Sequence, residues 1–203
     1  IRGSKDLQER FIGNAFMLNE AERERILKHP TGKYPHTALT KPFYDKAKDL
    51  DDVTKMQYID IHFWLIGDIL LKADKMSMAN SLEVRVPFLD RVVFDVARKV
   101  PTEYKVNKEN TKFAMRQAAH RYLPDMVAEK KKLGFPVPIR IWLREENYYN
   151  MVKEAFHSPA AEEFFKVDEI MKYLDEHKAG KADNSRKIWT IYMFLVWHKQ
   201  FFG

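Results

Sequence analysis

The chain contains no cysteine and only 7 glycines among its 203 residues, and each shortage excludes a class of site. Without cysteine there are no disulfide bridges, cysteine-ligated zinc sites, iron–sulfur clusters or thiol nucleophiles, and an intracellular, cytoplasmic location is favoured. The two glycines closest in sequence are Gly3 and Gly13, whereas a loop that cradles phosphate groups needs clustered glycines. Any nucleotide chemistry would therefore need another segment to hold the phosphates.

Long apolar runs are also scarce. The longest, residues 188–197, is about half of the roughly 20 residues that a membrane-spanning helix needs, so we expect no transmembrane segment. The first thirty residues lack the apolar centre of a signal peptide, and the chain opens with Ile1 instead of Met. We therefore expect the sequence to be a piece of a longer protein.

What the chain does have is apolar bulk and mixed charge. Hydrophobic residues make up 45% of it and aromatic residues 13%, enough to form one or two compact units. The net charge is +6, with acidic residues interspersed among the basic ones. A basic helical module that binds nucleic acid is one alternative that this charge leaves open, and a helical docking scaffold is another.

Capping residues and prolines predict the organisation of the first half. Asn19 is expected to cap a helix over residues 20–28, and the composition of residues 30–42 is typical of a connecting loop. The predicted division therefore places an N-terminal connecting segment at 1–42 and a helical part at 43–203. Asp51 or Asp52 should cap the next helix, which Gly67 is expected to break or kink.

Further along, residues 82–86 alternate in the manner of a short strand or extended turn. Ser158 precedes Pro159 as a helix cap would, Asp168 is expected to cap residues 169–178, and Gly180 is placed as a helix C-terminal glycine. The last helix, about 186–201, is apolar on nearly every side, which predicts burial between other helices. The fold class is mainly α, with at most one or two short strands.

Charged residues concentrate at three places that are candidates for a site. Asp68, Lys72 and Lys75 recur at helical spacing on one face, where an exposed ladder of ion pairs is the alternative to a site. Glu83 and Arg85 alternate within an apolar stretch, which favours structural charge pairing over contact with a ligand.

The third place is the basic run at residues 130–132, which leads into a loop rich in Gly and Pro. Such runs are often only solvated, but this loop could fix one lysine in a phosphate site. The seven histidines fall at no spacing typical of metal ligands, so no metal site is expected within this chain.

Three strings carry a resemblance to a known family. LLKADKMSMANSLEVRVPFLD, then TKFAMRQAAHRYLP, then KKKLGFPVPIRIWL lie in one order within residues 58–143. This succession resembles the C-terminal portion of glutamine-dependent asparagine synthetases. The resemblance implies the helical C-terminal part of an α/β synthetase domain of the adenine-nucleotide α-hydrolase-like (ATP-pyrophosphatase) class.

The resemblance also implies a reaction. In that family the synthetase domain uses ATP and Mg²⁺ to adenylate the side-chain carboxylate of aspartate, and ammonia then displaces AMP. The ammonia comes from glutamine through an N-terminal glutaminase domain. Neither that domain nor the family's pyrophosphate loop has a match in this chain. The implied partners are therefore these missing segments of the same protein, together with aspartate, ATP and glutamine. No nucleic acid and no membrane is implied, a homodimer stays open, and the chain alone is expected to be inactive.

Residue roles follow from the resemblance by position. Lys132 matches the lysine of the family's R-x-K-x-G-F pattern, which implies that it stabilises negative charge on the α-phosphate during adenylation. Lys130 stands where the family often has Arg, and with Asp68, Lys72 and Lys75 it would line the wall of the ATP and substrate site. Asp74, Glu83 and Arg85 would support that wall by paired charges. A related ATP-dependent amidotransferase remains an alternative to an asparagine synthetase.

Overall fold

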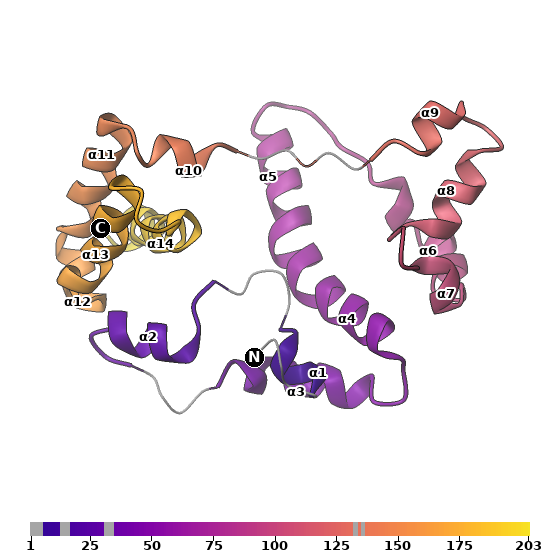
Figure 1. Cartoon of the computed structure of the whole chain (residues 1–203), viewed down its shortest axis with the longest axis horizontal. Helices are drawn as coiled ribbons and strands as arrows, with labels where there is room; N and C mark the ends of the chain where they lie inside the picture. Colours follow the sequence, from indigo (N-terminus) through magenta and orange to yellow (C-terminus); the bar gives the residue numbers. More distant parts are fainter. Residues whose placement is uncertain (1–5, 13–16, 31–34, 132–133, 135–136) are drawn as a thin grey trace. The chain divides into compact units, whose positions relative to one another are not determined.

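Helices account for nearly all regular structure in the computed structural model, which describes residues 6–12, 17–30, 35–131, 134 and 137–203 (Figure 1). Among these residues the only β contact is one isolated antiparallel bridge between Leu27 and Phe165. The predicted mainly α fold is confirmed. Contacts divide the chain into two compact units: unit 1 comprises Ile1–Asn14 and Leu39–Gly134, and unit 2 comprises Ala15–Ala38 and Phe135–Gly203. The division predicted between 1–42 and 43–203 concerns the family domain and stays a prediction.

Unit 1 holds the segments from which the candidate site residues come. Its helical elements are α1 (Leu7–Arg10), α3 (His36–Lys46, in this unit from Leu39), α4 (Asp52–Asp60), the π-helix η1 (Ile61–Leu70), α5 (Leu71–Met78), the 3₁₀-helix η2 (Pro87–Leu89), α6 (Arg91–Ala97), α7 (Thr102–Lys105), α8 (Phe113–Ala119) and α9 (Asp125–Ala128).

A small aromatic core joins α1, α3 and α4. Leu7, Tyr44 and Ile59 are buried together, with Phe43 and Phe63 packed against them. The Tyr44 hydroxyl donates a 2.6 Å hydrogen bond to the carbonyl of Phe11, which satisfies the one polar group in this cluster. Burial, followed by nearby carboxylates, raises the pKa of Tyr44 to about 12. The phenol therefore stays protonated and keeps donating across the ordinary pH range.

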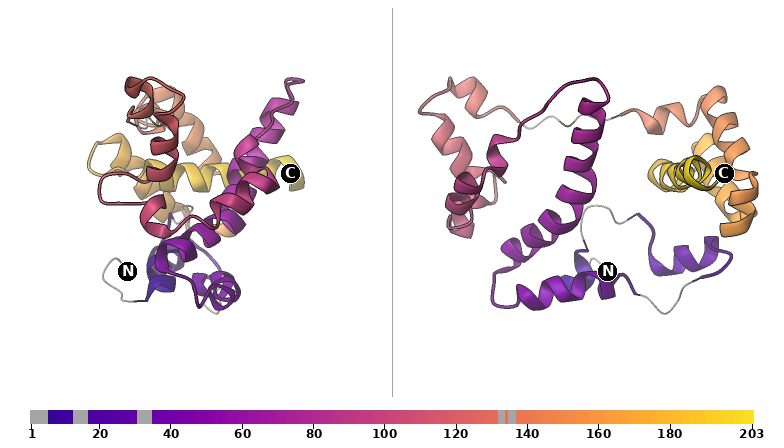
Figure 2. Two further views of the ribbon diagram at one scale, coloured as in Figure 1. Left: turned by 90° about the vertical axis from the view of Figure 1, so that its right-hand side faces the viewer. Right: turned by 180° about the vertical axis from the view of Figure 1, so that it is seen from behind.

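The helix that carries the first candidate residues is longer than the sequence predicts. The elements α4, η1 and α5 follow one another without interruption from Asp52 to Met78, and the views of Figures 1 and 2 show one continuous coil. Gly67 was expected to break or kink this helix. It lies inside η1, where the chain does not break, although the coil changes direction between α4 and α5 (Figures 1 and 2). Ten residues of π-helix absorb the local change in winding, and the strongly apolar sequence around Gly67 favours continued helix over a break. Asp51 caps the start as predicted, accepting from the backbone N–H groups of Val53 and Thr54.

Residues 30–42 do not form the predicted loop throughout. Although residues 31–34 lie outside the described residues, α3 begins at His36 and contains Pro42. A proline inside a helix removes one backbone hydrogen bond and costs about 3 kcal/mol. The burial of Thr40 and Tyr44 on α3, and of Ala47 directly after it, offsets this cost, so packing outweighs local propensity here.

Unit 2 is a small helical bundle. Its elements are α2 (Glu20–Ile26), α10 (Ile139–Trp142), α11 (Glu146–Phe156), α12 (Pro159–Phe164), α13 (Val167–Lys178) and α14 (Ser185–Phe202). Fully buried side chains from five of these helices meet in one core, among them Ile26, Phe156, Ala161, Leu174 and Ile188. The helices α11 and α13 are amphipathic and contribute their apolar faces to it.

The last helix was predicted to be buried between other helices, and α14 is buried only in part. Ile188, Ile191 and Leu195 face the core, whereas Trp197 is 47% exposed and Phe201 is 69% exposed. Among the described residues, α14 packs mainly against α10, α11, α12 and α13. The apolar pattern thus gives the amount of apolar surface on α14 but does not specify what covers it.

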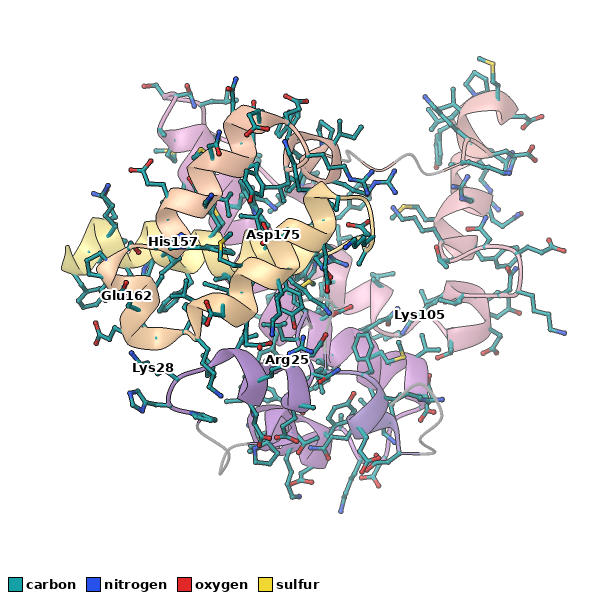
Figure 3. The ribbon with its side chains drawn as sticks, turned by 60° about the vertical axis from the view of Figure 1, so that its left-hand side comes forward. Arg25, Lys28, Lys105, His157, Glu162 and Asp175 are labelled. Carbon is teal, nitrogen blue, oxygen red and sulfur yellow. The ribbon has the colours of Figure 1, made fainter. Side chains whose placement is uncertain are left out.

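Charged side chains fasten α2 to the rest of unit 2. The Arg25 guanidinium donates a 2.7 Å hydrogen bond to the Tyr173 hydroxyl, and Lys187 on α14 forms an ion pair with Glu22. Figure 3 shows Arg25 and Lys28 on the side of α2 that faces the C-terminal helices, where Lys28 donates to the carbonyl of Glu162. Burial raises the pKa of Glu22, but the hydrogen bonds from Lys187 and from a backbone N–H outweigh it and lower that pKa below its usual value.

Most of the predicted caps are confirmed. Asn19 forms a reciprocal capping box with Glu22, Ser158 caps α12, and Gly180 follows α13 with a φ of 71°. The cap predicted at Asp168 is wrong: α13 begins two residues earlier than predicted, at Val167, so Lys166 is its N-cap and Asp168 lies in the first turn. A carboxylate in that position still complements the positive end of the helix.

Candidate functional site

The first group of candidate residues lies on the outer surface of the continuous helix of unit 1. Lys72 Nζ lies 3.4 Å from Asp68 Oδ2, one helical turn apart as the sequence predicts. Lys72, Asp74 and Lys75 are exposed and Asp68 is half-buried. An exposed pair of this kind contributes well under about 1 kcal/mol, so the structure of unit 1 does not itself require these charges.

The second group lies on the segment after α5. Residues 82–86 form no regular element, and among the described residues they pair with no strand, so the short strand is not observed. Glu83 and Arg85 form an ion pair with each other, as the alternating pattern favours. Both are exposed rather than embedded, and so are their apolar neighbours Val84 and Val86.

The basic loop, residues 130–138, forms the third group. Lys130 is exposed at its start, whereas Lys132, the residue to which the resemblance gives the central role, lies outside the described residues. In the part of the chain that the structure describes, the ion pairs of the candidate residues stay within their own segments. Their convergence on one site is therefore still a prediction.

A residue that the sequence analysis missed holds the start of this loop. Arg116 on α8 donates through Nη1 to the carbonyl of Ala128, at 2.7 Å, and through Nη2 to the carbonyl of Lys130, at 2.8 Å. Carbonyls at the C-terminal end of a helix lack intrahelical partners, and a forked guanidinium can satisfy two of them at once. The Arg116 Nε is buried and has no hydrogen-bond partner among the described residues.

His120 extends this contact by one helical turn. Its Nδ1 lies 2.8 Å from Asp125 at the start of α9, and its Nε2 lies 4.0 Å from Glu129 just beyond the end of α9. Arg116 and His120 are four residues apart and so share a face of α8. That face holds α9 at both ends and fixes the chain up to Lys130.

The far end of the loop is held in unit 2 by a second missed residue. His177 on α13 is fully buried, with Nε2 at 2.9 Å from the carbonyl of Arg140 on α10. Its Nδ1 accepts a hydrogen bond from the backbone N–H of Asn184 at 3.3 Å. Because that N–H can only donate, Nδ1 is the accepting nitrogen of this bond, and Nε2 is the nitrogen that donates to the Arg140 carbonyl.

The sequence carries only a partial signal for these anchors. Arg116 and His120 both lie in the string TKFAMRQAAHRYLP, and their spacing on one face is readable. Their partners are mostly backbone carbonyls, which any residue type supplies, so no pattern of side chains identifies them.

The described residues hold few features of other kinds of site. No group of three or more His, Asp or Glu residues among them is placed to hold a metal ion. None of the helices described is both long and apolar enough to span a membrane.

Comparison with known proteins identifies the family. The family model described as asparagine synthase matches residues 3–199. The chain belongs to the asparagine synthase family. Its helices are therefore part of an adenine-nucleotide α-hydrolase-like domain, as the resemblance implies.

Several curated relatives of this family are similar over nearly the whole chain. Asparagine synthetase [glutamine-hydrolyzing] 1 of Bacillus subtilis is 48% identical over 197 residues, which are 97% of this chain and 31% of the relative. A putative asparagine synthetase [glutamine-hydrolyzing] of Mycobacterium tuberculosis is 42% identical over 200 residues, 98% of this chain and again 31% of the relative. Asparagine synthetase B of Escherichia coli is 32% identical over 91 residues, or 44% of this chain.

The chain thus spans about a third of the length of the relatives that it matches best among these. No solved structure is a significant match to it. Membership of the asparagine synthase family is established by sequence, and the helical architecture by the structure described above.

Proposed function

We propose that this chain is the helical C-terminal part of the synthetase domain of a glutamine-dependent asparagine synthetase. The observation that carries the proposal is the family match over residues 3–199, with 48% identity to a relative named as glutamine-hydrolysing. The complete enzyme would convert aspartate, ATP and glutamine-derived ammonia to asparagine, AMP and pyrophosphate through a β-aspartyl-adenylate. Mg²⁺ would arrive with ATP as part of the substrate complex, and the proposed location is the cytoplasm.

Lys132 is the proposed catalytic residue. A lysine ammonium is a compact positive charge that suits the negative charge developing on the α-phosphate during adenylation. Lys130, Asp68, Lys72 and Lys75 would line the site, and Asp74, Glu83 and Arg85 would support its wall. The exposure of these side chains in unit 1 leaves them available to a ligand or to another segment.

The proposed partners are a glutaminase domain and a nucleotide-binding segment of the same protein. The relatives are about three times as long as their match to this chain. Unit 1 also exposes large apolar side chains along α5, the following segment and α6, including Met76, Val84, Phe88, Val92 and Val96. A stable monomer rarely exposes so many, and contact with such segments would bury them. A homodimer stays a prediction.

The catalytic role is tested by Lys132→Ala in the full-length gene product. We expect aspartate-dependent pyrophosphate release to fall to background while glutaminase activity survives, because the two reactions use separate sites. Lys131→Ala is the matched control, since it removes the same charge from the adjacent position, and it should keep most of the synthetase activity. Retention of asparagine synthesis by Lys132→Ala would remove that lysine from the mechanism.

The incompleteness of the nucleotide site is tested by calorimetric titration of the 203-residue chain with Mg-ATP, with and without aspartate. The chain has no cluster of glycines to hold phosphates, so we expect no measurable binding and no synthesis by the chain alone. Saturable binding that aspartate strengthens would contradict this expectation and would place a nucleotide site within these helices.

A further inference from the structure

The start of the basic loop is held by one side chain through two bonds. The Arg116 guanidinium reaches the carbonyls of Ala128 and Lys130 at 2.7 and 2.8 Å, both within normal hydrogen-bond length. Bonds from a charged donor are stronger than neutral ones, and a fork that makes two of them fixes direction as well as distance. Ala128 is itself buried, so the first of the two bonds is shielded from water.

The surroundings of Arg116 hold the guanidinium in place. Its Nε is buried, and the neighbouring His120 bonds to Asp125 on the same short helix, α9. Rotation of the guanidinium away from α9 would break both carbonyl bonds at once. The backbone from Asp125 to Lys130 is thus tied to α8 by side chains of a single helical face.

We propose that Arg116 is a positioning residue for the synthetase reaction: by fixing the backbone at Ala128 and Lys130, it sets the place from which the chain continues to Lys132. This inference rests on the function proposed for Lys132. Arg116 itself acts on the backbone and need not touch any substrate. Lysine cannot replace it, because one ammonium on a shorter stem does not present two donors in the fixed spacing that the two carbonyls require.

The test combines hydrogen exchange with kinetics. In the 203-residue chain, Arg116→Lys should speed exchange of the backbone amides of residues 129–131 by roughly tenfold or more, the equivalent of one lost charge-assisted hydrogen bond. Exchange in α4 and in unit 2 should not change. Arg98→Lys is the matched control: Arg98 is an exposed arginine of the same unit that pairs only with Asp95, one turn away on α6.

In the full-length gene product, Arg116→Lys should lower kcat for aspartate-dependent pyrophosphate release by on the order of 10²-fold, as expected when a catalytic group is misplaced by about 1 Å. The KM for ATP and the glutaminase activity should change little. A variant that only unfolds would lose all of these together, and Arg116→Gln provides a second side chain of similar polarity in case the lysine variant does so.

The experiments distinguish failure of the function proposed for Lys132 from failure of the positioning role proposed for Arg116. If Lys132→Ala retains synthesis, the proposed function fails, whatever Arg116 does. If Lys132→Ala abolishes synthesis but Arg116→Lys keeps the full kcat, or leaves exchange at 129–131 unchanged, the positioning role of Arg116 is wrong and the function of Lys132 stands.

Discussion

Replacing His177 with phenylalanine tests the anchor at the far end of the basic loop. The two side chains are similar in size and His177 is fully buried, so His177→Phe leaves no large cavity. It removes the bond to the Arg140 carbonyl, worth about 1 kcal/mol net, and leaves the Asn184 N–H unpaired, which costs about 1–3 kcal/mol in a buried position. Arg140 is exposed, so water can satisfy its carbonyl again. The expected loss of stability is about 2–4 kcal/mol.

Urea unfolding followed by tryptophan fluorescence measures this loss. Three of the four tryptophans, Trp142, Trp189 and Trp197, lie in unit 2, so the signal reports chiefly on the unit that contains His177. With a urea dependence of about 2 kcal/mol/M, the midpoint should fall by about 1–2 M. His157→Phe is the matched control: that histidine is exposed at the end of α11 and should change stability by less than about 0.5 kcal/mol. Equal midpoints for the two variants would refute the hydrogen-bond accounting.

Three smaller changes test other local arguments. Glu22→Gln preserves the capping geometry but removes the charge that pairs with Lys187. The pKa of Glu22 is lowered in the folded state, so its charge stabilises the fold at pH values above the unfolded-state pKa of about 4.3. This stabilisation is lost as the pH falls through the folded-state pKa. Urea unfolding at pH 7 and pH 3 should therefore show a smaller difference for the variant than for the parent chain. Gly180→Ala should cost about 1–2 kcal/mol in the same assay because φ is 71°, and since no atom lies within 4 Å of an added Cβ, Gly180→Asn should recover part of the loss. Asp51→Ala removes the cap of α4 and should cost about 0.5–2 kcal/mol, measured by thermal unfolding with circular dichroism; no change would mean that the cap is replaced by water.

Features that depend on residues close in sequence were predictable. Asn19, Asp51 and Ser158 cap their helices because a side-chain oxygen meets a backbone N–H two or three positions later, so both partners lie within one short window. The ion pair between Asp68 and Lys72 follows from the same locality. The family motifs were recognisable for a different reason: they indicate related proteins even where the local structure cannot be predicted from the sequence.

Features that depend on distant partners were not predictable. Pro42 in isolation indicates a loop, but the burial of Tyr44 against α1 and α4 keeps α3 helical through it. Gly67 indicates a break or a kink, and the helix continues through it in η1 with altered winding. At Pro42 the local preference against helix is about 3 kcal/mol, and packing against other segments of the chain outweighs it.

The basic loop is recognisable from residues close in sequence, whereas the side chains that anchor it depend on distant partners. The loop was therefore predictable from the sequence, and its anchors, Arg116 and His177, were not. The lysines of residues 130–132 are recognisable because they are consecutive charged side chains that lead into a loop rich in Gly and Pro, whereas Arg116 and His177 bind carbonyls that carry no residue identity. When a side chain binds a backbone carbonyl, the interaction requires a particular residue type on the side-chain partner alone. Its partner can be any residue, and Ala128 and Arg140 have nothing in common. The arginines and histidines that hold the ends of such a loop are therefore identified from hydrogen bonds in the structure. Their variants test whether the loop positions a catalytic group, separately from the chemistry of that group itself.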